Sequence, residues 1–207
     1  MKKNAFTLSE VLITLTILGV VAAVLIPTIM NIGPNKNKAM FKKAYNTLEK
    51  VVSELINDEG LYPEDTTLVG FFNTTAATIE GSSYSGGIKF CNLISKKLNI
   101  IGASTNCNAA QTLTSGDTNK GTGSFTTNDG ITWYFSPTAF SSTATTTAVV
   151  TVDINGTSQY SNSSPNCRYN ATTCKNPDQF EVYVVNTGRM YVTGIKEQEY
   201  IQSGSIK

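Results

Sequence analysis

The sequence predicts an α+β fold in which a long amino-terminal helix packs on a small antiparallel sheet. The first observation behind this prediction is a helical pattern at the start of the chain, apolar over residues 6–26 and amphipathic over residues 41–56. The second is a set of short β-forming segments between turn dipeptides over residues 129–207. Such segments suit an antiparallel sheet with one face on the helix and the other toward solvent or neighbours.

The apolar run Phe6–Ile26 has 21 residues and a single charge, Glu10. A helix rises about 1.5 Å per residue, so a run of this length spans about 30 Å and is long enough to cross a bilayer core. Its apolar side chains leave no continuous polar face, which indicates a buried or lipid-embedded helix. We therefore predict a transmembrane helix over residues 6–30.

Two simpler interpretations of this run are a cleaved signal peptide and a plain membrane anchor. Val21-Ala22-Ala23 resembles a signal-peptidase site, but the apolar run is longer than the roughly 7–15 residues of a signal peptide and continues beyond Ala23. A plain anchor fits the length. It leaves Glu10 unexplained, because a carboxylate in lipid is costly unless it is paired or neutralised.

A five-residue basic leader ends at Ala5 and is followed by Phe6-Thr7-Leu8-Ser9-Glu10 and the apolar helix. This pattern resembles the type IV pilin and type II secretion pseudopilin family, and the resemblance covers residues 1–60. Pro27 also falls where many pilins carry a helix-bending proline. One difference is that the family usually has glycine where this chain has Ala5.

The resemblance implies a structural subunit and no enzyme. A membrane prepilin peptidase would cleave between Ala5 and Phe6 and methylate the new amino group of Phe6, and Glu10 would act in assembly. The precursor would span the inner membrane once, and assembly machinery there would build it with itself and other pilins into a periplasmic or cell-surface filament. This filament would be a pilus (fimbrium) or a protein-secretion pseudopilus. The competing hypothesis is a membrane-anchored exported binding module or enzyme with an uncleaved anchor.

Composition limits the other functions. The net charge of +1 predicts no nucleic-acid partner, and the absence of histidine excludes histidine-dependent catalysis and the commonest catalytic zinc sites. No cofactor is expected. The four cysteines allow three pairings, of which we predict the local pairs Cys91–Cys107 and Cys167–Cys174. A zinc site built from all four is disfavoured because the sequence has no Cys-x-x-Cys pair.

The resemblance and the patterns together divide the chain into five parts. Residues 1–5 form the leader peptide, residues 6–30 the transmembrane and filament-core helix, and residues 31–60 its amphipathic second half. Residues 61–128 form a variable connection between helix and sheet, and residues 129–207 form the sheet region with a cysteine-closed loop.

Prolines and glycines set the expected helix boundaries. Pro27 is expected to bend or break the first helix, and Gly33-Pro34 to interrupt it more strongly, with Asn35 capping the second stretch. Gly60 is expected to end that stretch. Its apolar stripe consists of Phe41, Tyr45, Leu48, Val51, Val52, Leu55 and Ile56.

Within the connection we predict short helices over residues 68–77 and 88–101, a flexible loop over residues 81–87 and a polar, turn-rich segment over residues 112–127. Four strands are predicted in the sheet region, over residues 131–135, 147–152, 180–185 and 189–192.

One short motif suggests a metal. Asp153-x-Asn155-Gly156 resembles part of a calcium loop, which Asp178 would complete, and some pseudopilins hold calcium in a carboxy-terminal loop. The motif lacks the acidic spacing of an EF-hand, so a simple turn without metal is the favoured interpretation.

Overall fold

The computed structural model describes residues 8–30, 32–101, 107, 123–135, 140, 147–156, 168–169 and 171–202, without the side chains of residues 24–30, 32–35 and 123. It divides into two compact units, Met1–Lys36 and Asn37–Lys207, and each is described here by itself. The predicted cleavage site, Ala5 and Phe6, lies outside the described residues.

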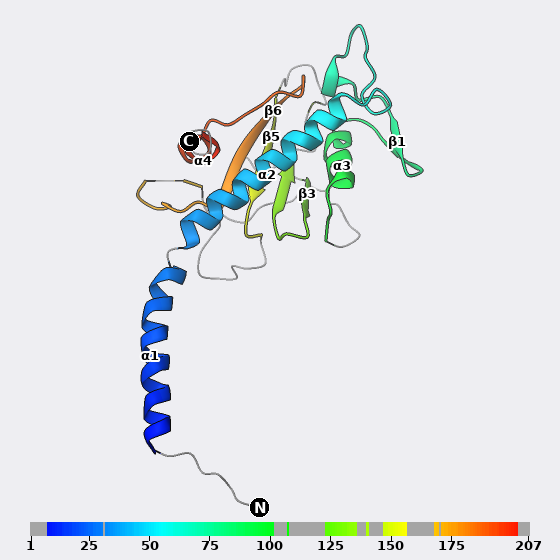
Figure 1. Cartoon of the computed structure of the whole chain (residues 1–207). Helices are drawn as coiled ribbons and strands as arrows, with labels where there is room; N and C mark the ends of the chain where they lie inside the picture. Colours follow the sequence, from blue (N-terminus) through cyan, green and yellow to red (C-terminus); the bar gives the residue numbers. More distant parts are fainter. Residues whose placement is uncertain are drawn as a thin grey trace, which may run out of the picture. The chain divides into compact units, whose positions relative to one another are not determined.

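The fold is α+β, as predicted (Figure 1). Its helices are α1 (Leu8–Met30), α2 (Ile32–Ile56), α3 (Ile88–Lys97) and α4 (Ile195–Gln202), with one 3-10 turn at Gly70–Phe72. A small hairpin consists of β1 (Ala77–Ile79) and β2 (Ser82–Tyr84). The main sheet consists of β3 (Gly123–Thr126), β4 (Thr132–Phe135), β5 (Thr147–Asp153), β6 (Gln179–Val185) and β7 (Met190–Tyr191).

The main sheet is antiparallel throughout, with strand order β3-β4-β5-β6-β7. Its register places Trp133 opposite Val152 and Val152 opposite Phe180, so these side chains share one face. The opposite face is polar at the neighbouring positions, where Thr132 pairs with Asp153 and Asp153 with Gln179.

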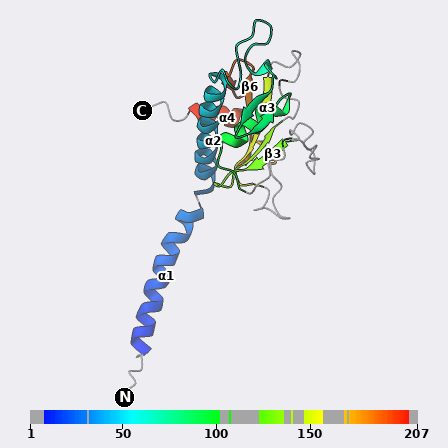
Figure 2. The ribbon, with the colours of Figure 1, turned by 90° about the vertical axis from the view of Figure 1, so that its right-hand side faces the viewer.

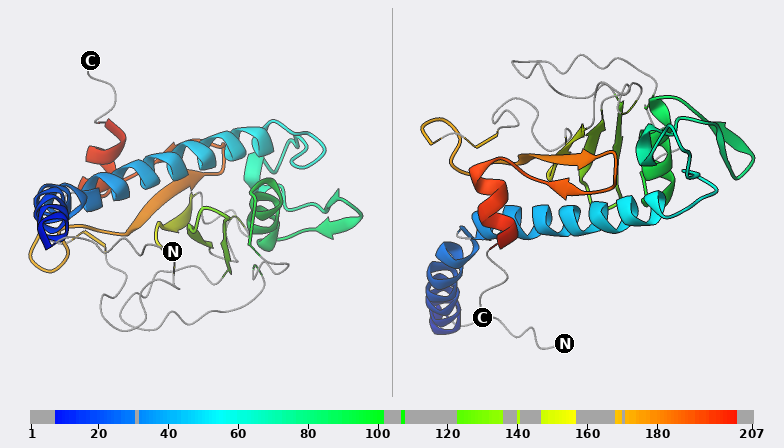
Figure 3. Two further views of the ribbon diagram at one scale, coloured as in Figure 1. Left: turned by 60° about the horizontal axis from the view of Figure 1, so that its bottom comes forward. Right: turned by 90° about the horizontal axis from the view of Figure 1, so that it is seen from above.

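Helix α2 crosses the apolar face of this sheet (Figures 1 and 3). Phe41 stacks on Phe180 with ring centroids 4.3 Å apart. The buried stripe of α2 joins the same core as the sheet, and it consists of Phe41, Ala44, Leu48, Val51, Val52 and Leu55. The predicted amphipathic helix over a sheet is therefore present.

The four predicted strands are confirmed in position, but the structure contains more strands than expected (Figure 2). β3 lies within the segment predicted to be turns, and its Phe125 points into the core. Residues 82–84 form a strand where a flexible loop was predicted, because Glu80 and Gly81 both adopt positive φ and close a tight hairpin turn. The helix predicted over residues 68–77 is only the short 3-10 turn, and α4 was not predicted.

The prediction that Gly33-Pro34 interrupts the helix, with Asn35 as the cap, is wrong. Helix α2 begins at Ile32 and contains all three residues. Pro34 lies in the first turn, where a backbone N–H has no partner within the helix, so the proline removes no hydrogen bond. Helix α1 continues through Pro27. A bend at Pro27 stays a prediction.

A disulfide joins Cys91 of α3 to Cys107, which confirms the first predicted pair. Closing a loop of about 15 residues stabilises a fold by roughly 3 kcal/mol in the chain-entropy account. Cys167 lies outside the described residues, so the second pair, Cys167–Cys174, stays a prediction.

Lys89 of α3 is buried without a carboxylate partner among the described residues, with only 1% of its surface exposed. Its Nζ donates to the backbone oxygens of Asn73 and Thr75 at 3.0 and 2.9 Å and lies 4.1 Å from the ring centroid of Tyr62. Two carbonyls and an aromatic face therefore surround the ammonium group and fasten α3 to the segment before the hairpin. Burial lowers the pKa of Lys89 to about 8.

Replacing Lys89 by methionine should lower the free energy of unfolding at neutral pH by roughly 1–3 kcal/mol, because two buried carbonyls lose their donor. The folded pKa of about 8 lies below the ordinary lysine pKa of 10.5, so the unfolded chain binds more protons between these pH values. The contribution of Lys89 to stability therefore rises with pH across that window. Urea unfolding should show this rise in the wild type and a shallower one in Lys89→Met.

The matched control is Lys96→Met, because Lys96 is a half-exposed lysine of the same helix paired with Glu80. It should change neither the stability nor the pH slope appreciably. Equal stability of Lys89→Met and the wild type would show that the Lys89 cage, formed by the carbonyls of Asn73 and Thr75 and the ring of Tyr62, does not stabilise the fold.

Candidate functional site

Helix α1 exposes apolar side chains on every described face. Its large apolar residues between Leu8 and Val21 are 46% to 85% exposed, and they are Leu8, Val11, Leu12, Ile13, Leu15, Ile17, Leu18, Val20 and Val21. A helix with no polar face is unfavourable in water, so this surface calls for an apolar environment.

The polar groups of α1 are arranged to suit such an environment. The hydroxyls of Thr14 and Thr16 donate to the backbone oxygens of Val11 and Ile13 at 2.9 and 2.8 Å. Each hydroxyl therefore satisfies its donor within the helix. Glu10, in the first turn of α1, is the helix's one acidic residue. Taken over the described residues alone, no helix is long and apolar enough to cross a membrane.

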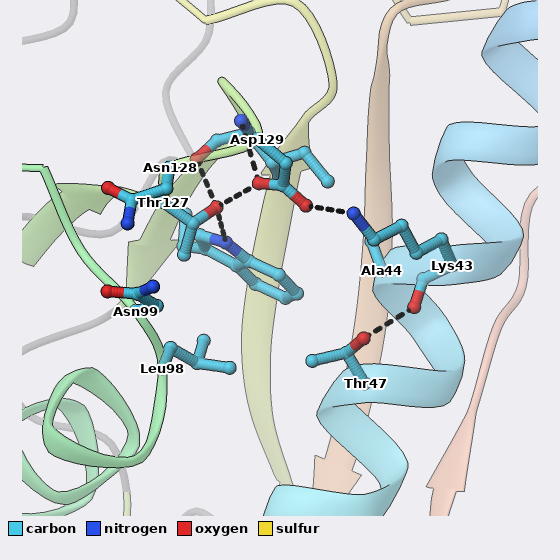
Figure 4. A pocket seen from close by; sticks show the side chains of 10 residues that line it. Lys43, Ala44, Thr47, Leu98, Asn99, Thr127, Asn128 and Asp129 are labelled. Atoms are coloured by element: carbon cyan, nitrogen blue, oxygen red, sulfur yellow. Dashed lines mark hydrogen bonds and ion pairs between the residues drawn. The ribbon is translucent and has the colours of Figure 1, made fainter.

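A pocket of about 270 Å³ lies between α2, the segment after α3 and the β3–β4 turn (Figure 4). Lys43 of α2 forms an ion pair of 2.8 Å with Asp129 in that turn. Thr127 Oγ1 donates to Asp129 Oδ1 at 2.6 Å and accepts the indole N–H of Trp133 at 3.2 Å. The remaining lining residues are Ala44, Thr47, Leu98, Asn99, Asn128 and Ile131.

The charges of this pocket are used within the fold. Burial raises the pKa of Asp129, but the hydrogen bonds from Lys43 and Thr127 outweigh it, so the pKa lies below its ordinary value. The carboxylate therefore stays ionised and clamps the β3–β4 turn onto α2. The arrangement provides a structural clamp and no activated nucleophile.

Sequence reasoning missed this clamp. Lys43 and Asp129 are separated by 86 residues in the sequence. No sequence pattern around Lys43 or Asp129 predicts their ion pair. Only the register of β3 on β4 and the docking of α2 bring the two side chains together.

The three residues of the calcium hypothesis are close together at the end of β5. Asp153 Oδ1 accepts the backbone N–H groups of Asn155 and Gly156 at 3.3 and 3.1 Å, which is the geometry of a turn capped by its own aspartate. Asn155 Nδ2 donates to Asp178 Oδ2 at 2.9 Å. Gln179 Nε2 donates to the second oxygen of Asp153 at 3.2 Å.

These contacts agree with the favoured interpretation, a turn. Burial raises the pKa of Asp153, and the nearby charge of Asp178 adds to this rise, although the hydrogen bonds from Gln179 and the backbone oppose it. Among the described residues no three acidic or cysteine side chains gather as a metal site. Two buried amide oxygens of the cluster, Asn155 Oδ1 and Gln179 Oε1, nevertheless accept no hydrogen bond from any described residue.

Comparison with known proteins identifies the start of the chain. Residues 1–26 match the prokaryotic N-terminal methylation motif. The chain has no significant match among curated proteins or among solved structures. The matched segment includes the predicted cleavage site and Glu10, and it ends next to Pro27. Residues 1–26 therefore carry the signature of type IV pilins and pseudopilins.

Proposed function

We propose that this protein is a structural subunit of a type IV pilus or pseudopilus. It is made as a prepilin, held in the inner membrane by its first helix and cleaved before Phe6 by a prepilin peptidase. The new amino group of Phe6 is then methylated, and the subunit is polymerised through α1. The observation that carries the proposal is the methylation motif at residues 1–26, within which α1 exposes apolar side chains on every described face.

The apolar surface of α1 suits both states of such a subunit. In the membrane the surface contacts lipid, and in a filament it contacts the same surface of neighbouring copies. Because the apolar area removed from water is similar in both states, exchange between them is close to balanced. Extraction from the membrane therefore requires an inner-membrane assembly machinery.

The proposed role of the second unit, Asn37–Lys207, is structural. Proteins with this motif are normally structural rather than enzymatic. The chain has no histidine, and Lys43, Asp129, Thr127 and Trp133 of the described pocket are hydrogen-bonded to one another. We place this unit in the periplasm or on the cell surface after assembly, where the Cys91–Cys107 disulfide persists.

The mature chain should begin at Phe6. Intact-mass spectrometry of protein purified from cells with the peptidase should show loss of residues 1–5 and the mass of one added methyl group. Ala5→Gly should keep or speed cleavage, and a bulky residue such as Ala5→Leu should block it. A start after Ala23, or an uncleaved chain, would instead favour the membrane-anchored binding module or enzyme.

Glu10→Ala should abolish filament incorporation or sharply reduce it. Cleavage creates a positive amino group at Phe6, four residues before Glu10, and in a filament the carboxylate would pair with the amino group of a neighbouring copy. Removing one partner of such a buried pair typically costs about 3–5 kcal/mol. Immunoblots of sheared-filament and membrane fractions measure this.

The matched control is Ser9→Ala, which removes a neighbouring polar group without removing charge and should leave filament yield unchanged. The membrane fraction should hold equal amounts of mature Glu10→Ala and wild-type chains. Wild-type filament yield from Glu10→Ala cells would mean that Glu10 lies hydrated at the membrane surface and has no role in assembly.

The alternative to a turn without metal, which we keep as a proposal to be tested, is that Asp153, Asn155 and Asp178 hold calcium. The supporting observation is the pair of buried oxygens without a hydrogen bond, Asn155 Oδ1 and Gln179 Oε1, beside two carboxylates. Amide and carboxylate oxygens are the ligands that calcium prefers. Calcium should raise the melting temperature of the metal-stripped full-length chain, but not that of Asn155→Ala. Asp65→Asn is the control. A wild-type melting temperature that does not change when calcium is added would contradict the proposal.

A further inference from the structure

Charge is segregated along α2 and the loop that follows it. Residues 38–43 contain three lysines and no acidic residue, whereas residues 54–65 contain five acidic residues and no basic one. The chain as a whole is nearly neutral, with a net charge of +1. The segregation therefore arises from the placement of the charges and not from an excess of either sign.

The basic end is formed by Lys38, Lys42 and Lys43 of α2 together with Lys175. Asn37 Nδ2 donates to the backbone oxygen of Pro177 at 3.0 Å, which fastens the loop containing the exposed Lys175 beside the start of this stretch. Lys43 is engaged by Asp129 but keeps 58% of its side chain exposed. Lys38 and Lys42 form no ion pair with any described residue.

Helix α4 lies beside the same half of α2 in Figures 1 and 3. Its Lys196 is paired with its own Glu199 at 2.6 Å, and its Glu197 is buried. Lys38 and Lys42 are thus the lysines at this end that no ion pair balances among the described residues.

The acidic end is the loop after α2. It contains Asp58, Glu59, Glu64 and Asp65, and all four are exposed. Hydrogen bonds from the backbone of Leu61 and Tyr62 to the backbone oxygen of Asp58, at 2.9 and 2.8 Å, fold this loop into a compact turn. Glu54, in the last turn before the loop, pairs with Lys97 and is not counted with the other four.

A hollow of about 480 Å³ opens at this acidic end. Its apolar lining comes from Ile56, Tyr62 and Val69, and Glu64 and Asp65 belong to its polar lining. A lysine side chain has the matching character, because its methylene stem packs on apolar surface while its ammonium group reaches a carboxylate.

The two ends are too far apart to neutralise each other. From Lys38 to Ile56 the helix rises about 27 Å, which is about three Debye lengths at physiological ionic strength. Each end therefore presents its own field to the surroundings. Opposite charges at the two ends of one molecule are complementary to the opposite ends of a second copy.

We infer that copies of this chain stack head to tail, with the basic end of one copy (Lys38, Lys42, Lys43 and Lys175) docking on the acidic end of the next (Asp58, Glu59, Glu64 and Asp65). A contact between two different surfaces of the same chain repeats without closing, which is the geometry of a filament. The inference deepens the proposed function and rests on it for its biological setting.

Charge reversal in the full-length chain tests the stacking. The basic-end variant carries Lys38→Glu, Lys42→Glu and Lys175→Glu, and the acidic-end variant carries Asp58→Lys, Glu59→Lys and Glu64→Lys, so that the net charge of each end changes sign. Each variant alone brings like charges together and should lower the yield of sheared filaments about tenfold or more. The control, Glu49→Lys with Lys50→Glu, swaps two exposed charges midway along α2 and should give wild-type yield.

Co-expression of the two variants is the decisive arm. The acidic-end variant then has two basic ends and the basic-end variant two acidic ends, so alternating stacks restore complementary contacts. Filament yield should return to near the wild-type value, and a chain with all six substitutions should behave in the same way. Equal amounts of mature chain with the Cys91–Cys107 disulfide in the membrane fractions show that the variants fold.

Other results would overturn the inference. Wild-type yield from either single-end variant would show that the ends do not meet. Loss in the basic-end variant alone, without rescue by the acidic-end variant, would indicate that the lysines contact anionic lipid headgroups instead.

The proposed function and the stacking can fail separately. If Glu10→Ala loses filaments while both end variants keep them, the proposed function stands and the stacking does not. If wild-type cells make no filaments, the proposed function fails. The stacking is then tested by sedimentation of detergent-solubilised full-length chains. Wild-type chains should self-associate in a salt-sensitive way, each end variant alone should not, and a mixture of the two variants should.

Discussion

Burial of the apolar stripe of α2 on one face of the five-stranded sheet is the contact on which the second unit, Asn37–Lys207, depends. Leu48, Val52 and Leu55 are completely buried there, and each such side chain contributes about 1.5–3 kcal/mol. The antiparallel register keeps the facing side chains of β4, β5 and β6 apolar. The Lys43–Asp129 clamp and the Lys89 cage then fasten neighbouring segments to this layer.

Docking of α2 also has a functional consequence, because a helix fixed along the sheet holds its two charged ends at a fixed separation. Its buried face leaves Lys42, Glu49 and Lys50 on the other faces. In the proposed filament, the apolar contacts of α1 do little to fix how neighbouring subunits are oriented. The charged ends of the second unit fix that orientation. Apolar association of α1 would thus supply most of the affinity between subunits, and charge complementarity of the second unit would set their register.

Local patterns were sufficient to predict the helix stripe, the four main strands and the Cys91–Cys107 pair, because each depends on neighbours in the sequence. They failed where the deciding contact is distant or a backbone conformation is unusual. Phe125 makes β3 a core strand inside a polar segment, and Glu80 adopts a positive φ that glycine would normally supply. Pro34 was misjudged because its effect depends on where the helix begins. The cleavage motif could be recognised without the structure, because it is a continuous stretch of sequence.

The central claim is that α1 is the contact shared by neighbouring subunits in a filament. A photo-crosslinking amino acid placed at Leu18, which is 64% exposed, tests this most directly. Irradiated sheared filaments should give a ladder of covalent multimers, and the membrane pool should give mainly lipid adducts and monomers. Monomers or lipid adducts alone in the sheared fraction would contradict the claim.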